Sequence, residues 1–129
     1  MVNLALMLPY PPSINAYWRA NGHRRFISAE GRKFKEDVAK YVIDEKVPKL
    51  GDAPLKVVII LQPRDRRKTD IDNRIKAVLD SLQDAGVYDD DSQVFYLQVH
   101  RGEAVKGGRC LVYIEAHQPE GELSPVLNR

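Results

Sequence analysis

The sequence predicts an α+β protein with one mixed β-sheet and helices packed on it. Two observations lead to this class: blocks of alternating or continuous apolar residues typical of strands, and two stretches with helical periodicity between them. Their order along the chain is β-α-β-α-β-β, with no internal repeat. The 129 residues suffice for one small domain, and a chain of this size buries roughly two-thirds of its unfolded surface.

The first half of the chain begins with a strand and ends with a helix. Val2–Leu8 alternates, with its apolar residues on one face, and three prolines within residues 9–12 end the strand. Residues 13–27 are predicted to be a polar, aromatic and basic loop. Ser28 is predicted to be the N-cap of a helix whose apolar residues follow at i, i+4, i+7 and i+8, namely Phe34, Val38, Tyr41 and Val42. Pro48 and Gly51 follow this helix.

The second half supplies the remaining strands and a second helix. Leu55–Leu61 is almost continuously aliphatic, which predicts a central strand buried on both faces. A charged connection, Pro63–Thr69, leads to a helix from about Ile71 to Ala85, closed by Gly86. Two further strands are predicted, Val94–His100 and Cys110–Ala116. We therefore expect a domain over residues 1–116 and a flexible C-terminal tail over residues 117–129.

Composition excludes several classes of protein. A single cysteine, Cys110, rules out an internal disulfide framework and a multi-cysteine zinc site, and it fits a reducing, cytoplasmic compartment. No apolar run approaches the ~20 residues of a membrane span, and the N-terminus lacks the features of a signal peptide, so we expect no membrane association. The net charge of +2 is too small to indicate a polyanionic partner. The distribution of charge is more informative.

Acidic residues gather around the second predicted helix. Asp70 and Asp72 converge only if Asp70 lies in a non-helical turn before the helix, because positions two apart in a regular helix point in nearly opposite directions. Lys76 is four residues after Asp72 on the same flank, which Asp80 continues. Asp91 precedes the next strand, whose start we assume returns toward the helix N-terminus.

Repulsion makes such a cluster chemically informative. Two carboxylates ~4 Å apart cost on the order of 4 kcal/mol at an effective dielectric constant near 20, so three of them need a proton, a basic group or a cation. Carboxylate-only sites suit Mg²⁺ or Mn²⁺. A structural interpretation stays open: Asp70 as an N-cap, Asp72 and Lys76 as an ordinary surface pair, and residues 89–91 as a solvated acidic turn.

Basic residues form two clusters, and aromatic residues are interleaved with the first. The first runs from Arg19 to Lys35 and includes Arg24 and Arg25, with Tyr17, Trp18 and Phe26 among the basic residues. The second flanks Asp70 and consists of Arg64, Arg66, Arg67, Lys68 and Arg74. Each cluster alone is compatible with a solvated surface. Next to the acidic cluster they favour an enzyme that cuts nucleic acid. In such an enzyme the basic side chains bind the phosphate backbone and the carboxylates bind a metal ion.

Read together, these segments resemble the RusA family of Holliday junction resolvases. The resemblance runs through LPYPPSINAYWR (8–19), ISAEGRKFKEDV (27–38), DRRKTDIDNRIKAVLDSLQDAGVYDDDSQV (65–94) and VKGGR (105–109). Its most specific part is D-x-D-N-x-x-K followed by A-G and D-D-x-Q-V. An additional Asp89 precedes the acidic pair in this sequence, and Lys68-Thr69 stands before Asp70.

The resemblance implies a homodimeric, Mg²⁺-dependent endonuclease of phage or bacterial origin that nicks two opposed strands of a four-way DNA junction. It implies that Asp70, Asp72 and Asp91 bind the metal and that Lys76 is catalytic. We expect Arg24, Arg25, Arg66, Arg67, Lys68 and Arg74 to contact DNA. Two alternatives stay open: a branched-DNA-binding protein without chemistry, and a metal-dependent hydrolase of small phosphorylated molecules.

Overall fold

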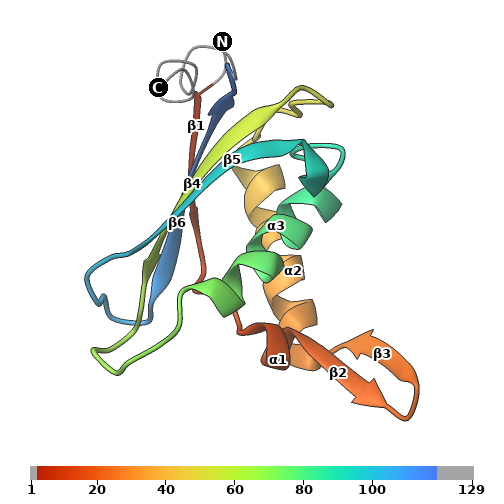
Figure 1. Ribbon diagram of the computed structural model, residues 1–129, viewed down its shortest axis with the longest axis vertical. Coiled ribbons are helices and arrows are strands. Elements are labelled where there is room, and N and C mark those ends of the chain that lie inside the picture. Colours follow the sequence, from red (N-terminus) through yellow and green to blue (C-terminus); the bar gives the residue numbers. More distant parts are fainter. Residues whose placement is uncertain (1–2, 119–129) are drawn as a thin grey trace, which may run out of the picture.

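Four strands form one mixed sheet in the computed structural model, which describes residues 3–118 (Figure 1). The strands are β1 (Asn3–Leu8), β4 (Leu55–Gln62), β5 (Val94–Arg101) and β6 (Arg109–Ala116), in the order β1-β6-β4-β5. The β4–β5 pair is parallel and the other pairs are antiparallel. The predicted α+β class with a mixed sheet is confirmed.

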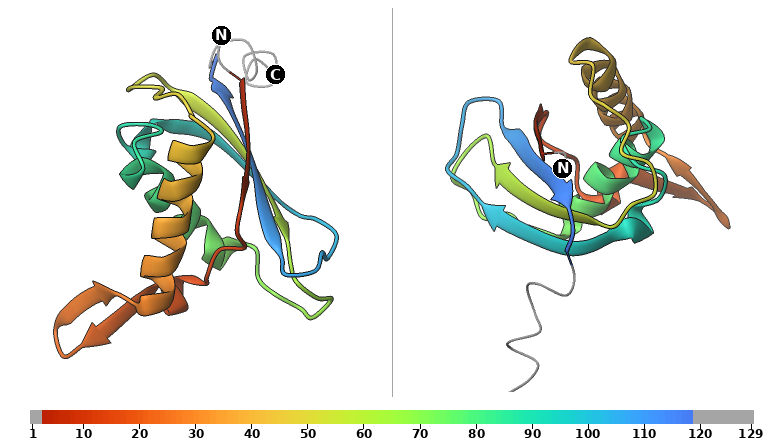
Figure 2. Two further views of the ribbon diagram at one scale, coloured as in Figure 1. Left: turned by 180° about the vertical axis from the view of Figure 1, so that it is seen from behind. Right: turned by 90° about the horizontal axis from the view of Figure 1, so that it is seen from above.

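Two helices, α2 (Ala29–Asp44) and α3 (Ile75–Asp84), cover one face of this sheet (Figure 2). Ser28 caps α2 as predicted, because its hydroxyl accepts a hydrogen bond of 2.9 Å from the Gly31 amide. Apolar side chains from both helices and from the inner face of the sheet form one core. Cys110 lies within it, where burial raises the pKa of its thiol to about 12, so this residue is structural.

The prediction that β4 is buried on both faces is wrong. Its alternate residues Leu55, Val57, Ile59 and Leu61 are buried, whereas Lys56, Val58, Ile60 and Gln62 are half-buried. The helices cover only the first set. β4 is almost continuously aliphatic because it lies between two other strands, β6 and β5. Among the described residues, no helix covers the second face of the sheet at β4.

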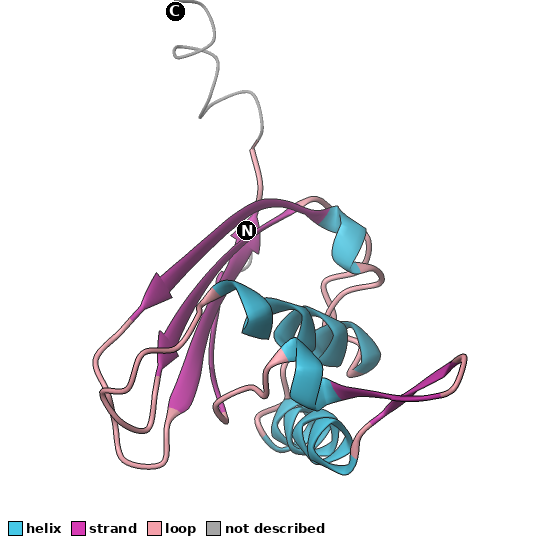
Figure 3. Ribbon diagram, turned by 60° about the horizontal axis from the view of Figure 1, so that its bottom comes forward, coloured by secondary structure: helices cyan, strands magenta, loops and turns pink. Residues whose placement is uncertain are grey.

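Residues 13–27, predicted to be a loop, are ordered secondary structure. Ser13 caps a short helix, α1 (Ile14–Tyr17), which leads into a hairpin of β2 (Trp18–Asn21) and β3 (Arg24–Ile27). Gly22 has a φ of 64° at the first position of the two-residue turn, where hairpin geometry favours glycine. The hairpin extends away from the helices (Figure 3).

The second predicted helix begins later than residue 71. A 3-10 turn, η1 (Asp72–Arg74), precedes α3, and no side chain caps either element. Another 3-10 turn, η2 (Asp91–Gln93), leads directly into β5. The carboxylates at both ends of α3 thus lie in or beside tight turns rather than within a regular helix.

Two further predictions bear on the ends of the chain and on membranes. The predicted tail lies outside the described residues, except for His117 and Gln118. Within residues 3–118, no helix has the length and apolar character that a membrane crossing requires.

Candidate active site and nucleic-acid interface

Lys76 lies at the centre of the candidate active site. Its ammonium group is 2.8 Å from Oδ2 of Asp91 and 3.1 Å from Oδ1 of Asp80. Lys76 and Asp91 are fifteen residues apart in sequence. The Lys76 side chain thus reaches along α3 to Asp91, whose backbone lies near the C-terminal end of this helix, so the start of β5 does not return to the helix N-terminus as the sequence analysis assumed.

The turn η2 fixes the position of Asp91. Asp90 caps this turn, and Gln93 completes a capping box by accepting from the Asp90 amide. The Asp91 amide itself donates to Oε1 of Gln83, on α3, over 2.8 Å. Backbone hydrogen bonds thus hold Asp91 on both sides, which leaves its side chain directed at Lys76.

Asp70 and Asp72 lie at the opposite end of α3 from η2. Both are exposed, and Asp70 precedes the 3-10 turn, as convergence of the two carboxylates requires. The interpretation of Asp70 as an N-cap is wrong, because Ile71 occupies that position. Within the described part of the chain, Asp72 makes no ion pair with Lys76, which pairs with Asp80 and Asp91 instead.

Electrostatics assign a charge state to Lys76. Its hydrogen bond to Asp91, supported by that to Asp80, raises the pKa of the Lys76 ammonium above its ordinary value. Burial raises the pKa of the Asp80 carboxyl, and this effect outweighs the opposing attraction of Lys76. Its two carboxylate neighbours therefore favour the charged form of Lys76 in the free protein.

The carboxylates fit a hard divalent cation by donor chemistry. Asp70, Asp72 and Asp91 offer only oxygen atoms, which suit Mg²⁺ and Mn²⁺, and Oδ1 of the neighbouring Asn73 is buried without a hydrogen-bond partner. Across residues 3–118, no three acidic, histidine or cysteine side chains are gathered closely enough to hold an ion. The structure thus presents the donors separately, with Asp91 bound to Lys76.

The basic loop, residues 63–70, connects β4 to the candidate site. Asp65 binds the guanidinium of Arg67 at 2.8 and 3.1 Å and accepts from the Arg67 amide, and these bonds lower the pKa of the Asp65 carboxyl. Arg101, the last residue of β5, donates to the carbonyl oxygen of Arg67 over 2.7 Å. A longer contact of 3.4 Å joins Arg101 to the carbonyl of Thr69, directly before Asp70.

The predicted DNA-binding residues of this loop differ in their availability. Arg66 and Lys68 are exposed, and among the described residues no carboxylate pairs with them. Arg67 is exposed but already paired with Asp65. Sequence reasoning missed Asp65 and Arg101 as organisers of the loop. Arg101 gives no local signal, because its partners are more than thirty residues away.

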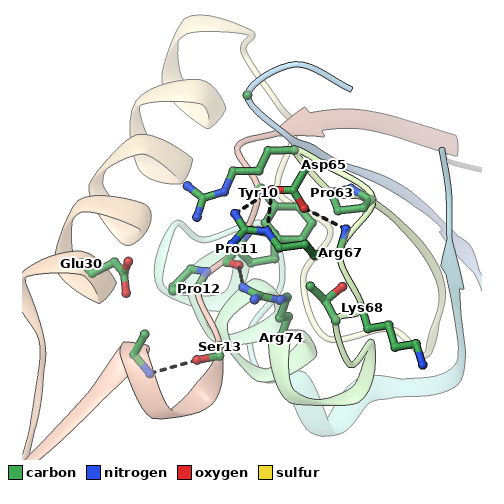
Figure 4. Close-up of a pocket in the computed structure, with 14 residues that line it drawn as sticks. Tyr10, Pro11, Pro12, Ser13, Glu30, Pro63, Asp65, Arg67, Lys68 and Arg74 are labelled. Carbon is green, nitrogen blue, oxygen red and sulfur yellow. Dashed lines mark hydrogen bonds and ion pairs between the residues drawn. The ribbon is translucent and has the colours of Figure 1, made fainter. Parts of the chain in front are cut away.

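Arg74 is committed to contacts within the protein. Its guanidinium donates to the carbonyl of Pro11 over 2.6 Å and lies 4.8 Å from the centre of the Tyr10 ring. It lines a polar cavity of about 460 Å³ together with Arg64, Arg67 and Lys68 (Figure 4). Arg74 therefore ties the segment after β1 to the start of α3 and contributes positive charge to the cavity.

Arg24 and Arg25 are exposed on β3, distant in sequence from the basic loop. The guanidinium of Arg25 lies 5.0 Å from the centre of the Trp18 ring. Tyr17, one of the aromatic residues interleaved with the first basic cluster, is buried and cannot contact DNA. The accessible aromatic residue of this region is Phe26, which is 48% exposed.

Comparisons with known proteins find relatives along most of this chain. The sequence model of a family described as endodeoxyribonuclease RusA matches residues 9–115. The chain is 41% identical over 108 residues to the crossover junction endodeoxyribonuclease RusA of Enterobacteria phage HK97, covering 84% of this chain and 90% of the relative. It is 40% identical over 110 residues to the protein of that name from Escherichia coli K12, covering 84% and 91%. The corresponding protein of Enterobacteria phage 82 is 42% identical over 105 residues, covering 81% and 87%. The chain therefore belongs to the RusA endodeoxyribonuclease family.

Proposed function

We propose that this protein is a divalent-metal-dependent Holliday junction resolvase, which nicks two opposed strands of a four-way DNA junction. The observation that carries the proposal is the contact of 2.8 Å between Lys76 and Asp91. It joins the acidic turn before β5 to the helix that begins beside Asp70 and Asp72, in a chain of this nuclease family.

Asp70, Asp72 and Asp91 would hold the metal, Mg²⁺ or Mn²⁺. Such an ion, when bound, lowers the pKa of water and stabilises charge that develops on the phosphate. The exposed positions of Asp70 and Asp72 leave both carboxylates open to an ion and to a phosphodiester. Asp91 is half-buried and neutralised by Lys76.

Lys76 acts in this proposal as a fixed cation. Its raised pKa keeps the ammonium charged through the neutral range, so it donates hydrogen bonds and neutralises negative charge. It orients Asp91 in the free protein. With a phosphodiester in place, the same ammonium can bind a non-bridging oxygen or the attacking water.

The exposed basic residues supply the DNA interface. Arg66 and Lys68 are accessible beside Asp70, and Arg24 and Arg25 extend the positive surface to the hairpin. Resolution needs two symmetric incisions, whereas one chain carries one candidate site. A twofold homodimer would relate two sites as the opposed strands of a junction are related. We propose this assembly in the bacterial cytoplasm, where phage DNA recombines.

The decisive experiment incubates the protein with a synthetic four-way junction, with Mg²⁺ or with EDTA, beside Asp70→Asn. We expect paired symmetric nicks with Mg²⁺, none with EDTA, and restored cleavage after Mg²⁺ is added back. Asp70→Asn should bind the junction with at least the affinity of the native protein and leave it intact.

The outcomes separate the alternatives. Binding without nicks under Mg²⁺ and Mn²⁺ would leave a branched-DNA-binding protein. Undiminished cleavage by Asp70→Asn would remove that residue from the site. Cleavage of small phosphate esters in preference to DNA would support the small-molecule hydrolase.

A further inference from the structure

The β2–β3 hairpin forms an arm, residues 18–27, that stands apart from the rest of the fold (Figure 3). Its tip is open: a side chain at Gly22 would meet no atom within 4 Å, and Ala20, His23, Arg24 and Arg25 are all exposed. Isolated two-stranded hairpins are marginally stable in water, so an exposed one is commonly stabilised by what it contacts.

The base of the arm is fixed to the body. Trp18 and Ile27 are opposite each other in the hairpin, and both pack against the core. Trp18 makes an edge contact with the buried Tyr17, with ring centres 5.4 Å apart. The guanidinium of Arg25 lies 5.0 Å from the centre of the Trp18 ring. The arm is therefore presented in a defined direction although its tip is uncovered.

Arg24 and Phe26 share the opposite face of the arm from Trp18, since alternate residues of a strand point to the same side. Phe26 is 48% exposed, and the arm contains three arginines and no acidic residue. An exposed aromatic ring beside a guanidinium matches nucleic acid, in which a base offers a π-face next to a phosphate. The charge disfavours a second copy of this basic arm as its partner.

The position of the arm in the fold also allows it to contact DNA that is bound at the candidate site. In Figure 1 the arm and the basic loop are at the same end of the molecule, on either side of the start of α3. Between them, α1 packs against η1 and α3. DNA bound at the carboxylates can therefore extend toward the arm.

We infer that the arm recognises the branch point of the junction, with Phe26 stacking on an exposed base and Arg24 binding an adjacent phosphate. This inference rests on the proposed function. A continuous duplex covers the faces of its bases by stacking, whereas a branch point interrupts stacking and exposes them. Phe26 therefore discriminates branched from linear DNA, and Arg24 contributes affinity for both.

The test measures affinity in EDTA, so that binding is observed without cleavage. Fluorescence anisotropy gives the Kd for a four-way junction and for a linear duplex of the same length, and 2-aminopurine at the branch point reports stacking. Phe26→Ala should weaken junction binding by about tenfold and change duplex binding by less than about twofold. Phe26→Tyr should retain the preference, and Arg24→Ala should weaken both complexes by similar factors.

Controls separate recognition from folding. Phe95→Ala removes a 60% exposed phenylalanine from β5, outside the arm, and should leave both affinities unchanged. Phe26→Leu keeps apolar bulk and lacks the aromatic face, so it should reproduce the loss of junction preference with a native melting temperature. If Phe26→Ala is unstable, the leucine variant decides.

Three results would overturn the inference: equal weakening of junction and duplex binding by Phe26→Leu, no weakening of either, or a change in sedimentation mass that makes the arm a subunit contact. Failure of the proposed function is recognised separately. In that case the native protein does not nick junctions with Mg²⁺, whatever the binding measurements in EDTA show.

Discussion

At the residue scale, Lys76 shows how local turn geometry changes the partners of a side chain. The spacing of four residues predicts a pair with Asp72, as in a regular helix. Asp72 instead lies in the 3-10 turn η1, in which successive side chains are set at a different angle. Lys76 pairs with Asp80, one α-helical turn later, and with Asp91, which belongs to the 3-10 turn η2.

Burial of the Asp80 carboxylate should lower the stability of the folded protein when this group is charged. Its pKa is raised in the folded state, so folding becomes less favourable as pH rises through and above the ordinary carboxyl range. At low pH the group is protonated in both states and has no such effect. Relative to the native protein, Asp80→Asn should therefore gain stability as pH increases from about 3 to 6.

Urea denaturation at several pH values measures this difference. Asp84→Asn is a matched control, because that carboxylate is on the same helix and more exposed. A difference between Asp80→Asn and native protein that stays constant with pH would show that burial of the Asp80 charge has no net cost.

At the scale of elements, one glutamine joins the acidic turn to the sheet. The Gln93 side chain accepts from the amides of Asp89 and Asp90 and donates to the carbonyls of Gly51 and Ala53, over 2.7–3.0 Å. Gln93 is buried, and all four hydrogen bonds are partly shielded from water. Gln93 thus links η2 to the connection before β4 and places Asp91.

Gln93→Ala should lower the free energy of unfolding by about 2–3 kcal/mol, because four partly buried backbone groups lose their hydrogen bonds. It should also increase amide exchange at residues 89–92. Gln98→Ala is the control: its amide contacts the Tyr96 hydroxyl and the His100 ring in exposed hydrogen bonds, so a cost below about 1 kcal/mol is expected. Equal effects of the two substitutions would show that Gln93 has no special structural role.

Sequence patterns predicted the elements better than their arrangement. Periodicity located α2, β4, β5 and β6, and Ser28 was identified as a cap because capping is local. The hairpin was missed although Asn21-Gly22 is a strong turn signal, because its strands lack a regular apolar alternation. Strand order and the uncovered face of β4 depend on tertiary packing, which no local pattern encodes.

The same distinction holds for the candidate site. The motif residues and their resemblance to a family were available from the sequence, as was the position of Asp80 on the Lys76 flank. Gln83 and Arg101 were not, since they act on backbone groups brought close only by folding.

At the scale of the whole molecule, the arrangement of charge matters more than its sum. The net charge is only +2, yet the exposed loop arginine Arg66 and lysine Lys68 have no carboxylate partner among residues 3–118. Arg67 is partly neutralised by Asp65. The response of DNA binding to salt should therefore differ between neighbouring residues.

Arg66→Ala should reduce the slope of log K against log salt by about 0.9 in magnitude, as expected for one lost phosphate contact. Arg67→Ala should reduce it less, and Asp65→Asn should steepen it by releasing Arg67. Anisotropy titrations between about 50 and 200 mM salt measure these slopes. Identical slopes for all the variants would place the loop away from DNA.

The parallel pairing of β4 with β5 has a consequence for how such proteins diversify. Asp70, Asp72, Lys76 and Asp91 all lie on the single crossover between these strands, whereas the arm is encoded upstream of residue 28. A breakpoint between α2 and β4 would separate the segment that encodes the arm from the segment that encodes the crossover, and it would interrupt neither. A chimera joined in this interval can therefore combine the candidate site of one family member with the arm of another.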